Sequence, residues 1–198
     1  MKWKEPVWKG LVLEMNKTMK EIINILLYLL GVLCLTYLVI TFIGQRTKVE
    51  GASMEATLYD GDNLIVDKIT YRFRDPERFD IIVFPFRYEN NKFYIKRIIG
   101  LPGETVQIDS QGNIYIDGEI LEENYGKEVI RPENIGIAGE PVQLGEDEYF
   151  VMGDNRNNSS DSRREIVGNI KREDIVGRVV LRIWPLSRFG SLKHLMQE

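Results

Sequence analysis

The chain of 198 residues contains one cysteine and one histidine, which limits the chemistry that it can perform. Cys34 lies within an apolar run, and His194 is close to the C-terminus. A single cysteine excludes an internal disulfide, and without a Cys/His cluster no zinc site is expected. If the chain carries out nucleophilic catalysis, a thiol or a histidine-assisted serine is not the expected nucleophile. A serine with a lysine base remains, and Ser53 and Lys96 are the candidates.

Charged residues are absent from residues 22–43. As a helix this run would be roughly 33 Å long, close to the ~30 Å hydrocarbon core of a bilayer. We therefore predict a transmembrane helix over 22–43. A buried core helix and a cleaved signal peptide are the alternatives. The run is too long for the apolar region of a signal peptide, and residues 44–46 (Gly-Gln-Arg) make a poor cleavage site.

The balance of charge predicts how the chain lies across the membrane. Residues 1–43 carry five Lys and three Glu, whereas the remainder carries 21 basic and 27 acidic residues. The positive-inside rule then predicts a cytoplasmic tail over 1–21 and an extracytoplasmic β catalytic domain over 44–198, in a single-pass protein of the cell membrane. The formal net charge of −4 gives no reason to expect nucleic acid as a partner. The sequence also has no glycine-rich phosphate loop, so we expect no cofactor and no metal.

Beyond residue 43 the sequence predicts mostly strands. Segments rich in β-branched and aromatic residues are expected as strands at 64–66, 81–84, 93–99, 105–109, 114–117, 149–152 and 176–184. Turn residues at 110–113 predict a hairpin. No long amphipathic helix is visible there, so the expected fold class is mostly β: a partly open antiparallel β-barrel or sandwich preceded by one N-terminal transmembrane helix. Residues 122–147 are expected to form an excursion loop, and the tail from Ser187 onward is expected to be peripheral.

Four segments combine glycine with polar and charged residues. They are Gly-Ala-Ser-Met-Glu-Ala-Thr-Leu at 51–58, Gly-Asp-Asn-Leu-Ile-Val-Asp-Lys at 61–68, Lys-Arg-Ile-Ile-Gly-Leu-Pro-Gly-Glu at 96–104, and Gly-Asp-Asn-Arg-Asn-Asn-Ser-Ser-Asp-Ser-Arg at 153–163. In this order they resemble the boxes of type I signal peptidases, membrane-anchored serine proteases that remove signal peptides. The resemblance covers nearly all of residues 49–184 and includes the anchor. With a lysine as the base, the chain resembles the compact bacterial members of the family, whereas the relatives of the endoplasmic reticulum use histidine.

The chemistry of the pair agrees with this resemblance. A serine hydroxyl needs a base to take its proton, and a lysine is a base only when it is neutral. Burial lowers the pKa of a lysine from its reference value of about 10.4. We therefore expect Ser53 to attack the scissile carbonyl while Lys96 acts as general base. Without the neighbouring segments, a surface lysine and a loop serine would be the default interpretation.

The resemblance implies further roles by position. Ser159 would hydrogen-bond the Lys96 amine, and Asp161 and Arg163 would form a salt bridge that holds the region. The substrate would bind as an added strand, with small side chains one and three residues before the cut. The residues implied to line the shallow apolar pockets for these side chains are Val49, Met54 and Ile95. The implied partners are preprotein signal peptides, the lipid bilayer and the protein-export machinery.

Two departures from the family pattern leave an alternative open. Ala56 stands where members usually have proline, and Gly51 stands where some members have a serine that donates to the oxyanion. A catalytically weak or inactive homologue, acting as an envelope or pilus assembly module, is therefore the alternative function. Repressor self-cleavage proteases share the Ser/Lys chemistry, but they are cytosolic and have no membrane span.

Overall fold

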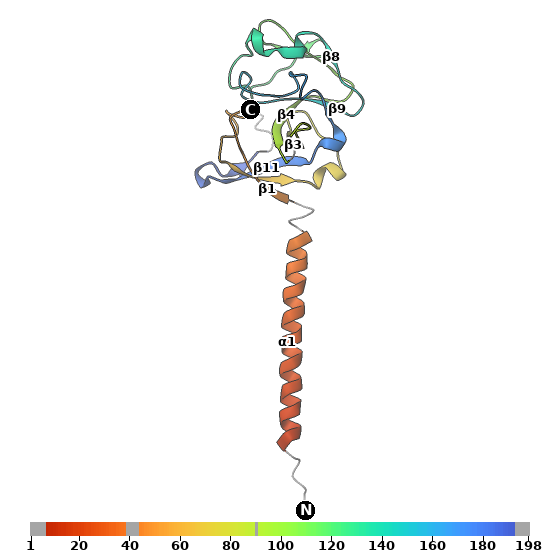
Figure 1. The fold of residues 1–198 in the computed structure, drawn as a ribbon, viewed down its shortest axis with the longest axis vertical. Coiled ribbons are helices and arrows are strands. Elements are labelled where there is room, and N and C mark those ends of the chain that lie inside the picture. Colours follow the sequence, from red (N-terminus) through yellow and green to blue (C-terminus); the bar gives the residue numbers. More distant parts are fainter. Residues whose placement is uncertain (1–6, 39–43, 90, 193–198) are drawn as a thin grey trace, which may run out of the picture. The chain divides into compact units, whose positions relative to one another are not determined.

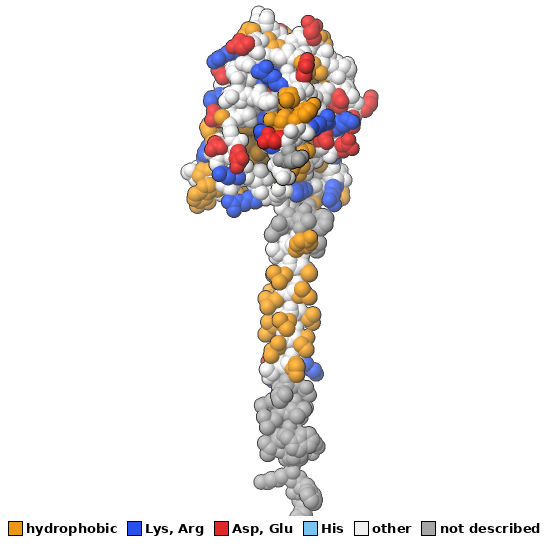
Figure 2. Space-filling view, in the orientation of Figure 1, with side chains coloured by type: hydrophobic (Ala, Val, Ile, Leu, Met, Phe, Trp, Pro, Cys, Tyr) orange, Lys and Arg blue, Asp and Glu red, His pale blue; other side chains and the backbone are white. Residues whose placement is uncertain are grey.

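The computed structural model describes residues 7–38, 44–89 and 91–192, and the chain separates into the two units 1–43 and 44–198. The first unit contains the helix α1 (Val7–Leu38), drawn in red to orange in Figure 1. Apolar side chains surround its upper part in Figure 2, and residues Lys17–Tyr37, with a mean hydropathy of 1.8, are long and apolar enough to cross a membrane. The helix begins well before residue 22. Residues 39–43 of the predicted span and His194 lie outside the described residues.

The second unit is built from two antiparallel sheets (Figure 1). The larger sheet has the order β1-β2-β11-β3-β4-β9-β10, and β12 pairs with β11. Its strands are β1 (Gly44–Lys48), β2 (Asn63–Asp67), β3 (Ile81–Pro85), β4 (Phe93–Gly100), β9 (Glu148–Met152), β10 (Ile170–Lys171), β11 (Gly177–Trp184) and β12 (Gly190–Ser191). The smaller sheet has the order β7-β6-β5-β8. Its strands are β5 (Thr105–Ile108), β6 (Ile114–Ile116), β7 (Glu119–Ile120) and β8 (Val142–Gln143).

Short 3-10 helices connect the strands. They are η2 (Thr70–Arg72), η3 (Pro132–Asn134), η4 (Gly136–Gly139), η5 (Arg172–Asp174) and η6 (Leu186–Arg188). In the part of the chain that the structure describes, the edge strands β1 and β10 do not pair with each other, so the larger sheet is open. The predicted fold class, mostly antiparallel β with one N-terminal apolar helix and no closed barrel, is confirmed.

The predicted strands and hairpin are present, with bounds that differ by a residue or two at some ends. β5 and β6 pair in register from Val106↔Ile116 to Ile108↔Ile114, on either side of the predicted turn. Successive residues of a strand face opposite sides. On β4, Ile99 accordingly packs into the cluster beneath the smaller sheet and Ile98 into the cluster that contains Phe84.

Two predictions about the periphery were wrong. The segment 122–147 is not an excursion loop, because β8 pairs with β5 and four of its side chains are buried in the core beneath the smaller sheet. These are Ile130, Ile135, Ala138 and Leu144. The described part of the tail, residues 187–192, is not peripheral either, since β12 pairs with β11 and Leu192 packs into the core around Val49. In both segments isolated apolar residues are buried among charged ones, so no period in the sequence reveals them.

Candidate active site

In the second unit the side chains of Ser53 and Lys96 lie within hydrogen-bond distance of each other. Ser53 lies on the turn that follows β1, and Lys96 lies on β4 opposite Ile82 of β3. The Lys96 Nζ donates to the Ser53 Oγ over 2.7 Å and to the Ile95 carbonyl over 3.0 Å. The structure thus brings together the two residues that the sequence named as nucleophile and base.

The Lys96 amine is buried beside an aromatic ring. The residue is 3% exposed, and its Nζ lies 5.0 Å from the centre of the Tyr94 ring. Burial lowers the pKa of Lys96 to about 8, although the carboxylates of Asp161 and Asp154 act in the opposite direction. A useful fraction of the amine is therefore neutral near pH 7 to 8.

The nucleophile turn is fixed by hydrogen bonds on both sides. The Gly51 N–H donates to the Asp60 carboxylate over 2.9 Å, at a backbone φ of +92° that favours glycine. The Ser53 carbonyl accepts the Asn155 N–H over 3.0 Å, and the Asn155 Nδ2 donates to the Ala52 carbonyl over 3.0 Å. Asn155, interpreted from the sequence as structural, therefore connects the fourth segment to the turn that carries Ser53, the expected nucleophile.

Asp161 and Arg163 form a buried, two-point ion pair. The Arg163 Nε and Nη2 donate to the two carboxylate oxygens, each over 2.8 Å. The Gly153 N–H donates to the same carboxylate over 3.0 Å, and Arg163 also donates to the Arg156 carbonyl over 2.6 Å. Burial acts to raise the pKa of Asp161, but Arg163 and the other donors outweigh it and hold the pKa below its usual range. The pair fixes the loop that follows β9.

Ser159 lies next to this pair. Its Oγ is buried close to Gly153, and its hydroxyl helps to lower the pKa of Asp161. No hydrogen bond of standard geometry joins the Ser159 Oγ to Lys96 or to any other described residue. The contact between Ser159 and Lys96 that the resemblance implies thus stays a prediction.

A second buried ion pair was missed in the sequence. Arg97, which follows Lys96 on β4, donates to both oxygens of Asp154 over 2.8 and 2.6 Å. The Thr57 hydroxyl donates to the same carboxylate over 2.5 Å. Asp154 therefore connects the nucleophile turn, the lysine strand and the fourth segment. The sequence shows these charges but not their pairing, because the partners are 57 positions apart.

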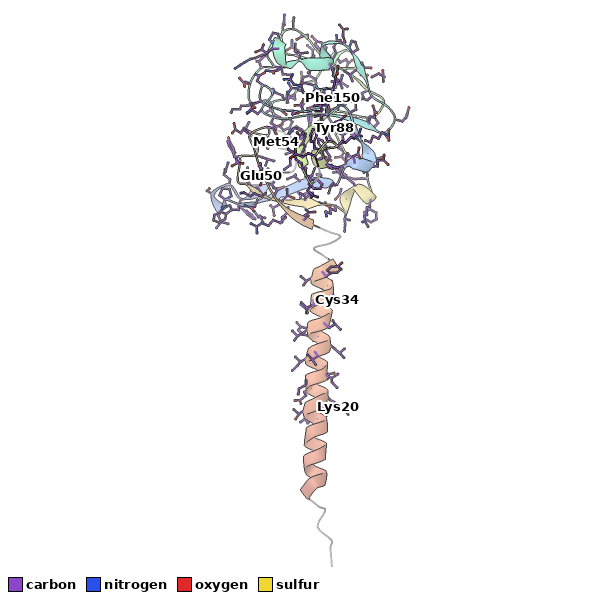
Figure 3. All side chains as sticks on the ribbon, viewed as in Figure 1. Lys20, Cys34, Glu50, Met54, Tyr88 and Phe150 are labelled. Carbon is purple, nitrogen blue, oxygen red and sulfur yellow. The ribbon has the colours of Figure 1, made fainter. Side chains whose placement is uncertain are left out.

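A cleft of about 730 Å³ opens onto the dyad. Its lining includes Ser53, Lys96 and all three residues implied for the apolar pockets, namely Val49, Met54 and Ile95. Met54 and Glu50, both labelled in Figure 3, lie on the side formed by the segment after β1. On β4, β9 pairs only from Arg97 onward, so among the described residues no strand covers that edge of Phe93–Lys96. The cleft thus offers a free strand edge beside the nucleophile.

No group of three or more His, Cys, Asp or Glu side chains that could hold a metal ion occurs among the described residues.

Comparison with known proteins places the chain in a family. The family model described as "Signal peptidase, peptidase S26" matches residues 20–184. The chain belongs to the S26 signal peptidase family. This confirms the resemblance drawn from the four segments and makes the chain a serine endopeptidase of the type I signal peptidase class.

Individual relatives match most of the chain. "Probable signal peptidase I-2" of Synechocystis sp. is 44% identical over 157 residues, which cover 77% of this chain and 68% of the relative. "Signal peptidase I P" of Bacillus subtilis subsp. natto is 37% identical over 178 residues, which cover 87% of this chain and 95% of the relative. A solved structure of a signal peptidase I from Enterococcus faecalis is 36% identical, covers 53% of this chain and 97% of its own, and has a TM-score of 0.44.

Proposed function

We propose that this protein is a membrane-anchored endopeptidase that removes signal peptides from preproteins after small residues, with Ser53 as nucleophile and Lys96 as general base. The observation that carries the proposal is the 2.7 Å hydrogen bond between the buried Lys96 amine and the Ser53 hydroxyl, at a cleft with a free strand edge. The family membership supports the substrate class.

The reaction proceeds in two steps through an ester. Neutral Lys96 takes the Ser53 proton as the oxygen adds to the scissile carbonyl, and the resulting ammonium returns that proton to the leaving amine. A water then adds to the ester carbonyl and gives its proton to Lys96. The ester bond breaks, and the Ser53 oxygen recovers a proton from the lysine.

When the Ser53 oxygen adds to the scissile carbonyl, negative charge develops on the carbonyl oxygen. The protein has to stabilise this oxyanion with hydrogen-bond donors. The Ser53 N–H makes no hydrogen bond within the described part of the chain, so it is available as one donor. Gly51 supplies no side-chain hydroxyl, and its own N–H is already bound by Asp60. A missing oxyanion donor costs about 2.7–4 kcal/mol in other serine proteases, so we expect a modest turnover rate.

Substrate selection follows from the cleft. An extended peptide that pairs with the free edge of β4 directs alternate side chains toward one face. We propose that the pockets on that face are bounded by Val49, Met54 and Ile95, which line the cleft, and that they accept small side chains at the first and third positions before the cut.

The apolar helix supports a location of this protein at a membrane. One N-terminal apolar helix and the family fit a single-pass membrane protein. We propose that the tail before the helix is cytoplasmic and that residues 44–198 lie outside, where an exported preprotein emerges from the export machinery. Added protease should then digest the catalytic domain in spheroplasts but not in inverted vesicles, and the reverse pattern would refute this orientation.

A preprotein assay with the purified full chain tests the activity. Wild type should convert the preprotein to its mature size, and Ser53→Ala and Lys96→Met should reduce this by at least about 10³-fold. Ser110→Ala and Lys171→Met, which change exposed residues, serve as matched controls. Wild-type rates in either dyad variant would refute the mechanism.

The second candidate function is that of an inactive homologue that assists envelope or pilus assembly. The observations that favour it are the absence of a hydroxyl at Gly51 and of proline at position 56. In that case the wild-type protein itself would produce no mature band in the same assay.

A further inference from the structure

A short segment outside the four motif segments packs against the fourth segment and against Arg97. We call residues 123–127 the strap. Near its start, Glu123 forms an ion pair of 2.6 Å with Arg156, and both side chains are almost fully buried. At its end the Lys127 N–H donates to the Asp154 carbonyl over 2.8 Å. The strap is therefore fastened at both ends to the fourth segment.

Between these two anchors the strap presents Tyr125 to Arg97. The Arg97 Cζ lies 3.8 Å from the centre of the Tyr125 ring, and the ring also packs on Phe79 at a centroid distance of 5.0 Å. The Phe79 carbonyl accepts a hydrogen bond of 3.0 Å from Arg97. A guanidinium stacked on an aromatic face in a desolvated site is held more firmly than by hydrogen bonds alone.

Arg97 connects this ring to both members of the dyad. It is the residue after Lys96 on β4, and its two bonds to Asp154 orient that carboxylate. Asp154 in turn accepts the Thr57 hydroxyl from the nucleophile turn. The chain of contacts thus runs from Tyr125 through Arg97 and Asp154 to Thr57, on the turn that carries Ser53.

We propose that Tyr125 is a positioning residue for the Ser53–Lys96 dyad, acting through the Arg97–Asp154 ion pair. This inference rests on the proposed function. It assigns to the strap a role in catalysis although, among the described residues, Tyr125 contacts Arg97 and Phe79 and not the two residues of the dyad.

The charge of Asp154 gives the proposal a measurable consequence. The charged and polar groups that act on the Lys96 amine are Asp161, Asp154, Arg163, the Ser53 hydroxyl, the Ile95 carbonyl and the Tyr94 ring. Asp154 favours the protonated amine, and Arg97 offsets that carboxylate. If the Tyr125 ring is removed, Arg97 loses its stacking partner and is held less firmly against Asp154, and water enters beside it. Both changes favour the ammonium, so less neutral base is present at pH 7.

The experiment compares two variants of the full-length protein. Tyr125→Phe keeps the ring and removes a hydroxyl that is buried without a hydrogen-bond partner among the described residues, so it should match wild type. Tyr125→Leu removes the aromatic face. We expect kcat/KM for Tyr125→Leu to fall roughly three-fold or more at pH 7 and to recover at pH 9 to 10, because the acid limb moves to higher pH.

The outcome is decisive even if Tyr125→Leu fails to fold. Glu123→Gln keeps the volume of the side chain but weakens the anchor at Arg156, and it should shift the acid limb in the same direction by less. An unchanged acid limb in every folded variant would overturn the proposal, even if activity fell uniformly at all pH values. Loss of activity in Ser53→Ala and Lys96→Met, measured alongside, would show that only the role of Tyr125 had failed.

Discussion

Gly153 lies so close to Ser159 that a methyl group at position 153 would overlap the Ser159 hydroxyl, and it would also overlap the Ser53 carbonyl. The absence of a side chain at this position is thus what allows the fourth segment to pack against the nucleophile turn.

Gly153→Ala should therefore displace Ser53 and Ser159 together. A shift of about 1 Å in a catalytic group costs on the order of 10²-fold in rate, so we expect kcat/KM to fall by that amount. Gly190→Ala is the matched control, because the added methyl meets no atom within 4 Å, and it should retain wild-type activity. Equal activities of the two variants, measured on a peptide substrate, would contradict this account of the packing.

The pH dependence of kcat/KM should report the pKa of the Lys96 amine. Lys96 acts only when neutral, and burial lowers its pKa to about 8. The amine is protonated below this pH, so kcat/KM should rise with pH through about 8 and level off above it. At pH 7 only about one-tenth of the free enzyme carries the neutral amine. A profile measured from pH 6 to 10 checks this, and an acid limb near pH 10 would place Lys96 in solvent.

The burial of Lys96 should lower the free energy of unfolding at neutral pH. At low pH the folded state holds the charged Lys96 amine away from water, whereas the unfolded chain leaves this amine in water. Between the folded pKa of about 8 and the ordinary value of 10.5 the unfolded chain binds more protons, so stability should rise with pH in that window. Lys96→Met should remove this dependence and, at pH 7, stabilise the fold by about 1–3 kcal/mol while abolishing activity. Denaturant unfolding at pH 7 and 10 tests this, and a less stable Lys96→Met at pH 7 would contradict it.

Much of this site could be predicted because its chemistry leaves few choices. With one Cys and one His, a serine with a lysine base remained, and the order of the four segments indicated the family and, by that resemblance, Ser53 and Lys96. The strands around them were predicted because β-branched and aromatic residues mark strands between clear turn residues.

The sequence could not predict contacts between side chains that are far apart along the chain. Arg97 is adjacent to Lys96, but its bonds to Asp154 and its stacking on Tyr125 depend on how two loops pack against strand β4. Tyr125 lies in a charged segment without a hydrophobic period, which is why that segment was interpreted as a loop. Long-range pairing of this kind is set by tertiary packing and leaves no local signal.

The Asp161–Arg163 pair should be costly to break. Removing the charge of Asp161 leaves Arg163 buried without its partner, so Asp161→Asn should cost about 3–5 kcal/mol of unfolding free energy. Asp174→Asn is the matched control, since Asp174 pairs with Arg87 over 2.7 Å at the surface, and it should cost below about 1 kcal/mol. Similar costs for both, from urea unfolding, would mean that Asp161 does not hold the loop.

Ala56 adopts a backbone φ of +90°, in the left-handed region that disfavours residues with a Cβ. This places local strain three positions after the nucleophile, where family members usually carry proline, whose ring holds φ near −65°. Ala56→Gly should relieve the strain and raise the unfolding free energy by about 1 kcal/mol. Ala52→Gly on the same turn, whose φ is negative, should instead lower it, because glycine adds only chain entropy to the unfolded state. If thermal unfolding gave both variants the same loss of stability, the left-handed conformation of Ala56 would be refuted, and proline would then be compatible with the turn.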